Sequence, residues 1–405
     1  MSTTITPVSE TERFESLDVL RGIAVLGILM VNIQAFAMYW GALSYPPAHM
    51  SLEGANQTVW FLTHVFFELK FITIFSALFG AGVLFMVGED PLASKSVHFR
   101  RMIWLFVIGL IHGFVFWFGD ILVPYALAGM IVVFFRRMSP GKLIGWGLGG
   151  IALTGLLMVA GTWAQGAMPG GAEPMPYGPN PPEAFLDQWV AAYQASFAES
   201  RIYNAIGELF ALFSQITFFA GRLVGVMFIG MALFKLGFLT AKWSLARYLA
   251  IGIVCAGLGI AASWWGGLHA LRTGFAMSEL WVHTGVNYGA SLLTAFGYAS
   301  LVMAACRIDW LKLVRLPFAC AGRMAFTNYL TQTLAMTFIF VGAPGLGLFG
   351  TVERTGQLQI VLAVWAVQLV VSTLWLRVFR FGPFEWLWRS LSYARLQPFL
   401  RRKPA

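Results

Sequence analysis

The stretch VLRGIAVLGILMVNIQAFAMYW, residues 19–40, decides the fold class. At about 20 residues, an apolar run of this kind is long enough to cross the hydrocarbon core of a bilayer as a helix. Similar apolar runs follow at 61–87, 102–118, 121–135, 143–162, 209–237, 247–266, 285–306, 317–341 and 358–378. The pattern predicts an all-α, polytopic integral membrane helical bundle with about ten transmembrane helices.

The composition excludes an ordinary soluble protein. Apolar residues make up 58% of the 405 residues, and charged residues only 11%. Soluble domains carry about a quarter of their residues as charged side chains. The 36 Phe and 16 Trp fit a membrane protein, because aromatic rings contact lipid and anchor helices at the interface.

Basic residues cluster in alternate connections between the apolar runs, and this pattern gives the orientation. We place the N-terminus in the cytoplasm and count each apolar run as one crossing of the membrane. Most of the 27 Lys and Arg residues then lie on the cytoplasmic side, and this holds for an even number of crossings. We therefore expect both termini in the cytoplasm and the bundle in the plasma membrane. The net charge of +9 follows from this distribution, so we expect membrane lipids as partners and no nucleic acid.

The same pattern divides the chain into a cytoplasmic N-terminal segment at 1–18, a transmembrane domain at 19–378 and a basic cytoplasmic tail at 379–405. The first segment is acidic, unlike the basic start of a cleavable signal peptide, so the first run is expected to remain as an anchor. The longest outer loop, 163–208, begins rich in Pro and Gly and turns helical and amphipathic from Glu183. One hypothesis is that it covers a cavity on the outer side.

Ionisable side chains inside a span cost about 2.5–3.5 kcal/mol at the bilayer centre, so each one suggests a functional site. In the first span, Asp18, Arg21 and Asn32 share one helix face, with an ion pair near the cytoplasm and an amide in the outer half. The competing explanation is that Asp18 and Arg21 anchor the helix, while Asn32 bonds a neighbouring helix.

Several polar residues are predicted to lie at one depth near the outer side. Successive spans run in opposite directions, which places six residues there: Asn32, His49, His64, Glu68, His112 and Asp120. A single histidine is more often structural than catalytic, but a shared depth favours one outward-facing pocket. We predict that these six residues form the catalytic site.

Further polar residues lie deeper. Arg222 falls near the middle of its span and needs an anion, a carbonyl or water as a partner. In the ninth run, Arg323, Asn328 and Gln332 lie in the inner half to middle, and hydrogen bonding between helices is the expected role of the Asn328 and Gln332 pair. The residues predicted to bind a donor or substrate are Asp18, Arg21, Arg222, Arg323, Asn328 and Gln332.

The sequence predicts no metal site and no tightly bound cofactor. His64 and Glu68 supply only two ligands, and the chain contains no HExxH or CxxC spacing. It also contains no Walker A sequence and no GxSxG elbow, the usual marks of ATP-driven transport and of lipase-type hydrolysis. Cys255, Cys306 and Cys320 lie inside apolar runs and are interpreted as buried free thiols.

Five motifs spread over the chain resemble the YeiB-type family of bacterial inner-membrane proteins, a domain of unknown function. They are LDVLRGIAVLGILMVN at 17–32, FSALFGAG ending at 82, GLIHGFVFWFGDILVPYA at 109–126, GRMAFTNYLTQ at 322–332 and GPFEWLWR at 382–389. The resemblance covers nearly the whole chain.

That family is distantly similar to transmembrane acyltransferases. Bacterial O-acyltransferases carry LDxLRG in the first span and a histidine eleven residues after the arginine, where this chain has Asn32. Because an amide is not a general base near neutral pH, the chain departs from that mechanism. The lysosomal heparan N-acetyltransferase is similar in its RG…VN span and a histidine in the next lumenal loop. That resemblance implies His49 as the base and Asn32 as a positioning or oxyanion-binding group, with His64 and His112 as alternatives.

The leading hypothesis is a membrane acyltransferase-like protein that moves an acyl group from a cytoplasmic acyl-CoA to a sugar or lipid hydroxyl on the outer face. In it, Glu68 or Asp120 orients the histidine, and Arg21 and Arg323 hold donor phosphates. The alternative is a transporter or permeation pathway for a polar or anionic solute along Arg222, Glu68 and Asn328. A third option is a non-catalytic membrane partner. The sequence fixes no oligomeric state.

Overall fold

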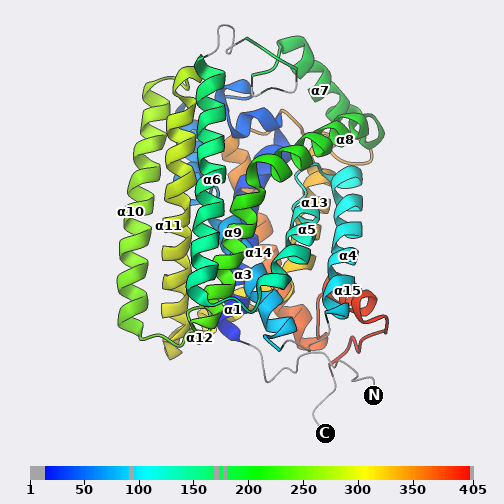
Figure 1. Ribbon diagram of the computed structural model, residues 1–405. Coiled ribbons are helices and arrows are strands. Elements are labelled where there is room, and N and C mark those ends of the chain that lie inside the picture. The colour runs from blue at the N-terminus through cyan, green and yellow to red at the C-terminus, as the bar shows by residue number, and fades with distance from the viewer. Residues whose placement is uncertain (1–13, 91–94, 168–172, 177, 179, 402–405) are drawn as a thin grey trace.

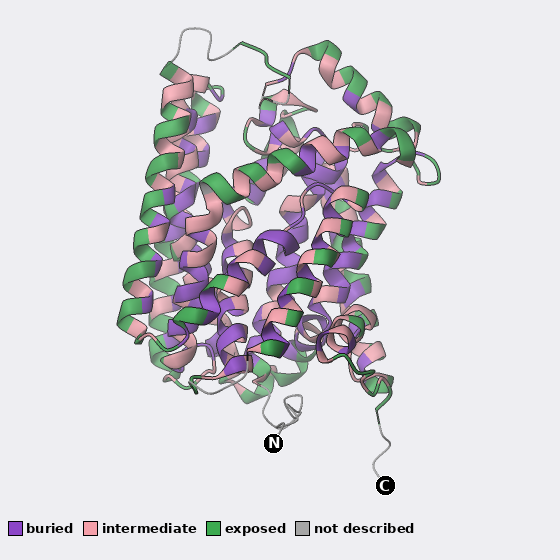
Figure 2. Cartoon of the chain, turned by 45° about the vertical axis from the view of Figure 1, so that its right-hand side comes forward, coloured by how far each residue is buried: buried purple, intermediate pink, exposed green. Residues whose placement is uncertain are grey.

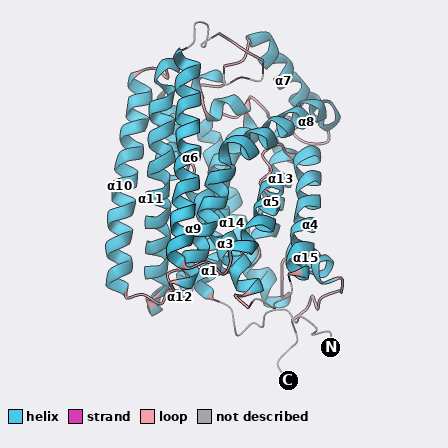
Figure 3. Ribbon diagram, in the orientation of Figure 1, coloured by secondary structure: helices cyan, strands magenta, loops and turns pink. Residues whose placement is uncertain are grey.

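The computed structural model describes residues 14–90, 95–167, 173–176, 178 and 180–401, and the regular elements in these residues are all helices (Figures 1 and 3). The main helices are α1 Glu15–Ala37, α2 Gly54–Phe66, α3 Lys70–Val87, α4 Ser96–Ile111, α5 Leu122–Val132, α6 Pro140–Ala167, α7 Glu183–Ala195, α8 Phe197–Ser214, α9 Ala220–Lys235, α10 Leu245–Arg272, α11 Leu280–Cys306, α12 Lys312–Arg323, α13 Ala325–Phe340, α14 Arg354–Val378 and α15 Pro383–Tyr393. The predicted all-α helical bundle is confirmed.

Among the described residues, seven helical segments are long and apolar enough to cross a membrane, or eight when the bent pair formed by α8 and α9 is taken as one span. Each apolar run in the sequence falls on helix. The run at 121–135 forms a shorter apolar helix, Leu122–Phe135, and the run at 317–341 is divided between α12 and α13. The difference from the predicted count of ten therefore comes from runs that fold as short or broken helices.

The distribution of apolar surface fits a bundle surrounded by lipid. The most apolar part of α1 is 78% buried, whereas that of α10 is 22% and that of α14 is 17% buried. The outward faces of the peripheral helices are exposed (Figure 2). Their exposed residues include large apolar side chains such as Trp146, Leu156 and Ile253. Soluble proteins rarely expose so much contiguous apolar surface. The α1 helix is thus the central helix, and its neighbours shield it from lipid.

Breaks in the helices occur where polar residues lie. Between α2 and α3, Leu69 adopts a left-handed conformation with φ of 64°, an uncommon choice for a residue with a branched side chain. Glu68 and Lys70 flank this break. At the end of α4, the segment η4, His112–Phe116, is a π-helix, a feature that often marks functional sites.

The α1 and α12 helices touch through two glycines of the sequence motifs. A Cβ atom added at Gly22 would overlap the carbonyl oxygen of Phe318, and one added at Gly322 would overlap that of Asp18. The absence of side chains lets the two backbones meet, as in small-residue contacts between membrane helices. This contact holds Arg21 and Arg323, the neighbours of the two glycines, at the same end of the bundle.

We expect alanine at Gly22 or Gly322 to lower the free energy of unfolding by about 1–3 kcal/mol, because the added methyl group separates the two helices. Thermal unfolding of the purified protein in nanodiscs, followed by tryptophan fluorescence, measures the effect. Gly149→Ala is the matched control, since a Cβ at Gly149 meets nothing within 4 Å. Equal unfolding temperatures for all three variants would contradict this account of the helix contact.

The start of α1 and the whole of α15 lie at one end of the bundle, which we call the basic end (Figure 1). The positive-inside rule assigns this end to the cytoplasm. At the opposite end, α7 lies across the helix ends and buries Trp189 and Tyr193 against Tyr39 and Phe349. The predicted outer loop at 163–208 includes 168–172, 177 and 179, which lie outside the described residues.

Candidate functional site

A cavity of about 330 Å³ opens at the basic end. Its walls come from α1, α3, α4, α5, α12, α13 and α15, so segments from both ends of the chain form it. The volume lies in the range of small-molecule sites. Among the predicted site residues, Asp18, Arg21 and Arg323 line this cavity.

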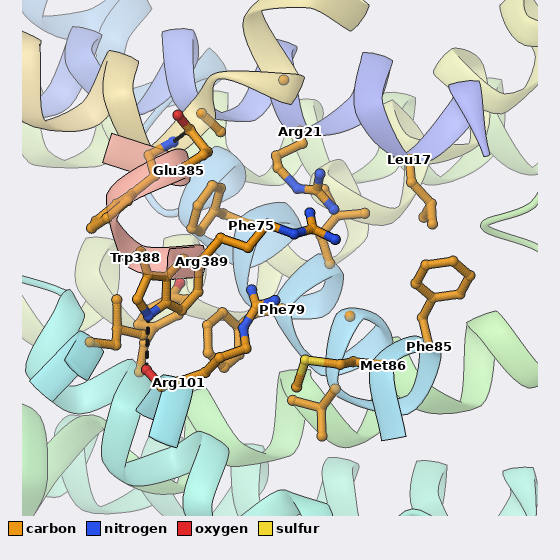
Figure 4. A pocket seen from close by; sticks show the side chains of 18 of the residues that line it. Leu17, Arg21, Phe75, Phe79, Phe85, Met86, Arg101, Glu385, Trp388 and Arg389 are labelled. Atoms are coloured by element: carbon orange, nitrogen blue, oxygen red, sulfur yellow. Dashed lines mark hydrogen bonds between the residues drawn. The ribbon is translucent and has the colours of Figure 1, made fainter. Parts of the chain in front are cut away.

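Four arginines give the cavity a cationic wall: Arg21, Arg101, Arg323 and Arg389. Arg21, Arg101 and Arg389 reach toward the same space from three different helices (Figure 4). Arg21 Nη1 forms an ion pair with Asp18 Oδ1 at 3.0 Å, and the buried Nε of Arg101 has no hydrogen-bond partner in the described part of the chain. Guanidinium groups bind phosphates and carboxylates in bidentate geometry, so this wall suits an anionic ligand.

The α15 helix completes the cavity and is fixed there by Glu385. Its Oε1 accepts hydrogen bonds from the backbone N–H groups of Phe326, at 2.7 Å, and Thr327, at 3.0 Å, while the Thr327 hydroxyl donates to Oε2. A carboxylate at this place caps the first turn of α13. Burial raises the pKa of Glu385, and these hydrogen bonds oppose the rise.

A second link joins α15 to α4. The Trp388 Nε1–H donates to the backbone carbonyl of Arg101 at 2.9 Å, and the Arg101 guanidinium lies over the Trp388 ring (Figure 4). The link therefore holds both a cation and an aromatic face at the cavity wall.

The deeper part of the cavity is apolar and aromatic. Side chains from α3, α4 and α5 form it, among them Phe75, Phe79, Leu105 and Leu122. His98 also lines the cavity, and its Nε2 bonds the carbonyl of Gly129 at 2.9 Å. The cavity is thus amphipathic, with cations at the basic end and apolar walls further inside. This combination matches a ligand with an anionic head and an apolar or extended chain.

Beyond Tyr329, which lines the cavity, lies a buried polar cluster. His112 Nδ1 donates to Asp120 Oδ1 at 2.8 Å, and His112 Nε2 lies 2.8 Å from Thr333 Oγ1. The backbone N–H of Val123 donates to Asp120 Oδ2 at 2.8 Å. The His112 and Tyr329 rings are 5.2 Å apart. Two of the predicted catalytic residues, His112 and Asp120, are therefore in direct contact.

Glu208 lies next to this cluster and was not predicted. It is fully buried, packs against Gly113, and neither of its carboxylate oxygens has a hydrogen-bond partner of normal geometry within the described residues. It comes from the amphipathic α8 helix, in the loop region where no sequence motif indicated a site.

His64 and Glu68 form a separate pair. His64 Nδ1 lies 2.7 Å from Glu68 Oε2, and its ring stacks on Trp60. Lys70 is fully buried beside it and donates to the His64 carbonyl at 2.7 Å and to Asn287 Oδ1 at 2.6 Å. These bonds join α2, α3 and α11. The buried ammonium group of Lys70 is therefore explained by hydrogen bonding between helices.

His49 lies in a third place, in the connection after α1. The Tyr39 backbone N–H donates to its Nδ1 at 3.0 Å. Burial, and next the charge of Arg354, lower the pKa of His49 to about 4. A histidine with this pKa is a weak base near neutral pH. Its hydrogen bond fixes the turn at the end of α1, a structural role.

The pKa of His49 predicts a pH dependence of stability. In the unfolded chain the pKa of His49 is 6.5, and in the folded chain it is about 4. The unfolded chain therefore binds more protons between these two values. The contribution of His49 to the free energy of unfolding is fully present above pH 6.5 and is lost as the pH falls toward 4. We expect the unfolding temperature of the wild type to fall by several degrees more over this window than that of His49→Asn, which keeps an acceptor for Tyr39. Parallel pH curves for the two proteins would contradict the prediction.

The six residues predicted to share an outward pocket therefore fall into separate groups, and none of them lines the cavity at the basic end. His112 with Asp120, His64 with Glu68, and His49 occupy different helix contacts. Asn32 is half-buried on α1 and makes no side-chain hydrogen bond to a described residue. Depth alone does not fix which helix faces meet, and the catalytic role of these six residues stays a prediction.

Three of the predicted binding residues serve the bundle interior. Arg222 donates to the Tyr288 carbonyl at 2.8 Å, to Ser291 Oγ at 2.8 Å and to Thr73 Oγ1 at 3.0 Å. Gln332 donates to Gln368 Oε1 at 2.9 Å, and Asn328 to the Ala321 carbonyl at 3.0 Å. None of the three lines the cavity.

Sequence reasoning missed much of the cavity. The residues not predicted include His98, Arg101, Tyr329, Glu385, Trp388 and Arg389. From the sequence, Arg101 and Arg389 indicate only the orientation of the chain in the membrane. A signal that could identify the cavity is that the motifs at 322–332 and 382–389 contain four of these six residues. No group of three or more His, Cys, Asp or Glu side chains placed to hold a metal occurs among the described residues.

Comparison with known proteins gives a consistent family. Residues 233–395 match the family model described as protein of unknown function (DUF418). The chain is 32% identical to the uncharacterized protein YeiB of Escherichia coli, over 96% of this chain and 99% of YeiB. It is also 32% identical to the uncharacterized protein YxaH of Bacillus subtilis, over 98% of each chain.

Proposed function

Because the chain belongs to the YeiB-type family, DUF418, we propose a chemistry for a member of that family: transfer of an acyl group from an acyl-CoA, bound at the basic end, to a hydroxyl-bearing acceptor. The observation that carries the proposal is the amphipathic cavity, with four arginines at its wall and apolar side chains further inside. An acyl-CoA has the matching chemistry, since its phosphates are anionic and its acyl chain is apolar.

The direction of the cavity supports this use. Its arginines lie at the end that the positive-inside rule assigns to the cytoplasm, where acyl-CoA is made. Its inner wall includes Tyr329, whose ring is 5.2 Å from that of His112. A donor whose phosphates contact Arg21 and Arg101 would therefore direct its thioester toward the His112 and Asp120 pair.

His112 is the histidine best arranged for proton transfer. Asp120 is fully buried and accepts from His112 Nδ1 at 2.8 Å, an arrangement that fixes the orientation of the ring. In the transfer, the C–S bond of the thioester breaks and a C–O bond to the acceptor forms. In the net reaction the acceptor hydroxyl loses its proton, CoA leaves as the free thiol, and His112 carries the proton between them.

The reaction can be tested by CoA release. We expect reconstituted protein to release free thiol from palmitoyl-CoA or acetyl-CoA slowly with water as acceptor, and faster with a hydroxyl-bearing lipid or sugar. Vesicles sorted by orientation test sidedness, because release requires donor on the basic end. A folded protein that binds donor yet releases no thiol with any acceptor would contradict the proposal.

The transport alternative has weaker support. Its central residue, Arg222, is 6% exposed and bonds three groups of the bundle interior. A solute passing that point would have to replace those hydrogen bonds. Solute flux that depends on Arg222, without chemical change of the solute, would favour transport.

A further inference from the structure

Three side chains behind the cavity wall form the constellation of a nucleophile, a base and an orienting acid. Thr333 Oγ1 lies 2.8 Å from His112 Nε2, and His112 Nδ1 lies 2.8 Å from Asp120 Oδ1. Asp120 follows His112 by eight residues, in the connection between η4 and α5, whereas Thr333 comes from α13, 221 residues after His112. A hydroxyl, an imidazole and a carboxylate linked in this order are the recurring arrangement of acyl-enzyme catalysis.

The hydrogen-bond directions fit that role. An ionised carboxylate only accepts, and Asp120 accepts from both His112 and the Val123 backbone N–H, so the proton of the neutral imidazole is on Nδ1. The unprotonated Nε2 then accepts from the Thr333 hydroxyl at 2.8 Å, whereas the other acceptor near this hydroxyl, the Tyr329 carbonyl, is 3.4 Å away. In this state His112 is ready to take the Thr333 proton.

Tyr329 supplies a link to the cavity. It lies one helical turn before Thr333 on α13, lines the cavity, and its buried hydroxyl has no hydrogen-bond partner of normal geometry in the described part of the chain. Buried hydroxyls are normally bonded, so a free phenolic donor beside a nucleophile is a candidate for binding an oxyanion.

We propose that the acyl group passes through an ester on Thr333, an inference that rests on the proposed function. Thr333 Oγ1 attacks the thioester carbonyl, and its proton moves to His112 Nε2. The C–S bond breaks, and the CoA thiolate takes that proton and leaves. In the second half, the acceptor hydroxyl attacks the ester, gives its proton to His112, and Thr333 recovers it as the C–O bond to the enzyme breaks.

A covalent intermediate fits the position of these groups in the bundle. The cavity opens at the basic end, whereas η4 follows the end of α4 that points toward the opposite end (Figure 1). An acyl-threonine allows donor and acceptor to react in turn from the two ends. The bundle then needs no open passage through which both substrates meet.

The test is to incubate the protein in nanodiscs with radiolabelled palmitoyl-CoA in the absence of acceptor. We expect one acyl group per chain by intact mass, on the peptide that contains Thr333. The label should survive neutral hydroxylamine, which removes thioesters on Cys320 and other thiols, and should be lost in alkaline hydroxylamine. Thr333→Ser should still become labelled, whereas Thr333→Val should not, although it binds palmitoyl-CoA as the wild type does.

Tyr329→Phe provides a second readout, since loss of an oxyanion donor slows acylation by about 10²–10³-fold. One outcome would overturn the acyl-threonine and leave the proposed function in place. In it, the wild type binds palmitoyl-CoA and transfers its acyl group without becoming labelled, and Thr333→Val is equally active. Label on a cysteine alone would also overturn it. Absence of palmitoyl-CoA binding in folded wild type would overturn the proposed function and this inference together.

Discussion

Replacing His112 by alanine is expected to lower acyl transfer by about 10²–10⁴-fold, the usual contribution of a positioned general base. Binding of acyl-CoA should be unchanged, because His112 does not line the cavity. The rate of CoA release and the dissociation constant, measured on the same nanodisc preparation, separate the two effects.

Asp120→Asn should act through the same step, because an asparagine at this place favours the wrong imidazole tautomer and costs about 10⁴-fold in related triads. His269→Ala is the matched control, since His269, near the end of α10, pairs with Glu279 in the turn that follows this helix, does not line the cavity and has no role in the proposed chemistry. If His112→Ala and His269→Ala released CoA at the same rate, the assignment of His112 would be wrong.

Removing the cavity arginines should have the largest effect on donor binding. A hydrogen bond to a charged group contributes about 1.5–3 kcal/mol, so Arg101→Ala should weaken acyl-CoA binding by about 10–150-fold, and the double variant with Arg21→Ala by more. The effect should shrink at high salt, because part of the attraction is screened. Equilibrium binding of fluorescent acyl-CoA at two salt concentrations measures it.

Arg137→Ala is the control for this experiment. Arg137 is an exposed arginine in the connection before α6 at the same end, and it does not line the cavity. Equal weakening by Arg137→Ala and Arg101→Ala would show a general surface attraction for anions and would contradict a specific site. Tighter binding of phosphatidic acid than of acyl-CoA, lost in Arg101→Ala, would instead reassign the cavity to a phospholipid.

Much of the fold could be predicted from the sequence because hydrophobic runs report on single helices. The runs at 19–40 and 358–378 correspond to α1 and α14, and the flaw that Glu68 and Lys70 introduce in the second run is a real break at Leu69. The run at 317–341 carries a comparable signal, because Arg323 lies directly before its division at Met324. The cap that Glu385 provides for α13 could not be predicted, because Glu385 is 58 residues away from Thr327 and helical periodicity relates only residues of the same helix.

The candidate site was predicted less completely, for a physical reason. Helical periodicity gives the face of a residue only while the helix is regular, and the π-helix at His112–Phe116 followed by a non-helical turn brings Asp120 back onto His112. Thr333 completes that contact from another part of the chain. The cavity itself depends on packing of α15 against α4, through Trp388 and Arg101.

The measurement that tests the central claim most directly is equilibrium binding of palmitoyl-CoA to the wild-type protein in nanodiscs, beside free CoA and palmitate. The account predicts saturable binding of palmitoyl-CoA that is tighter than that of either part alone, because the arginine wall and the apolar interior each hold one part of the ligand. No saturable binding to protein shown to be folded by its cooperative thermal unfolding would contradict it.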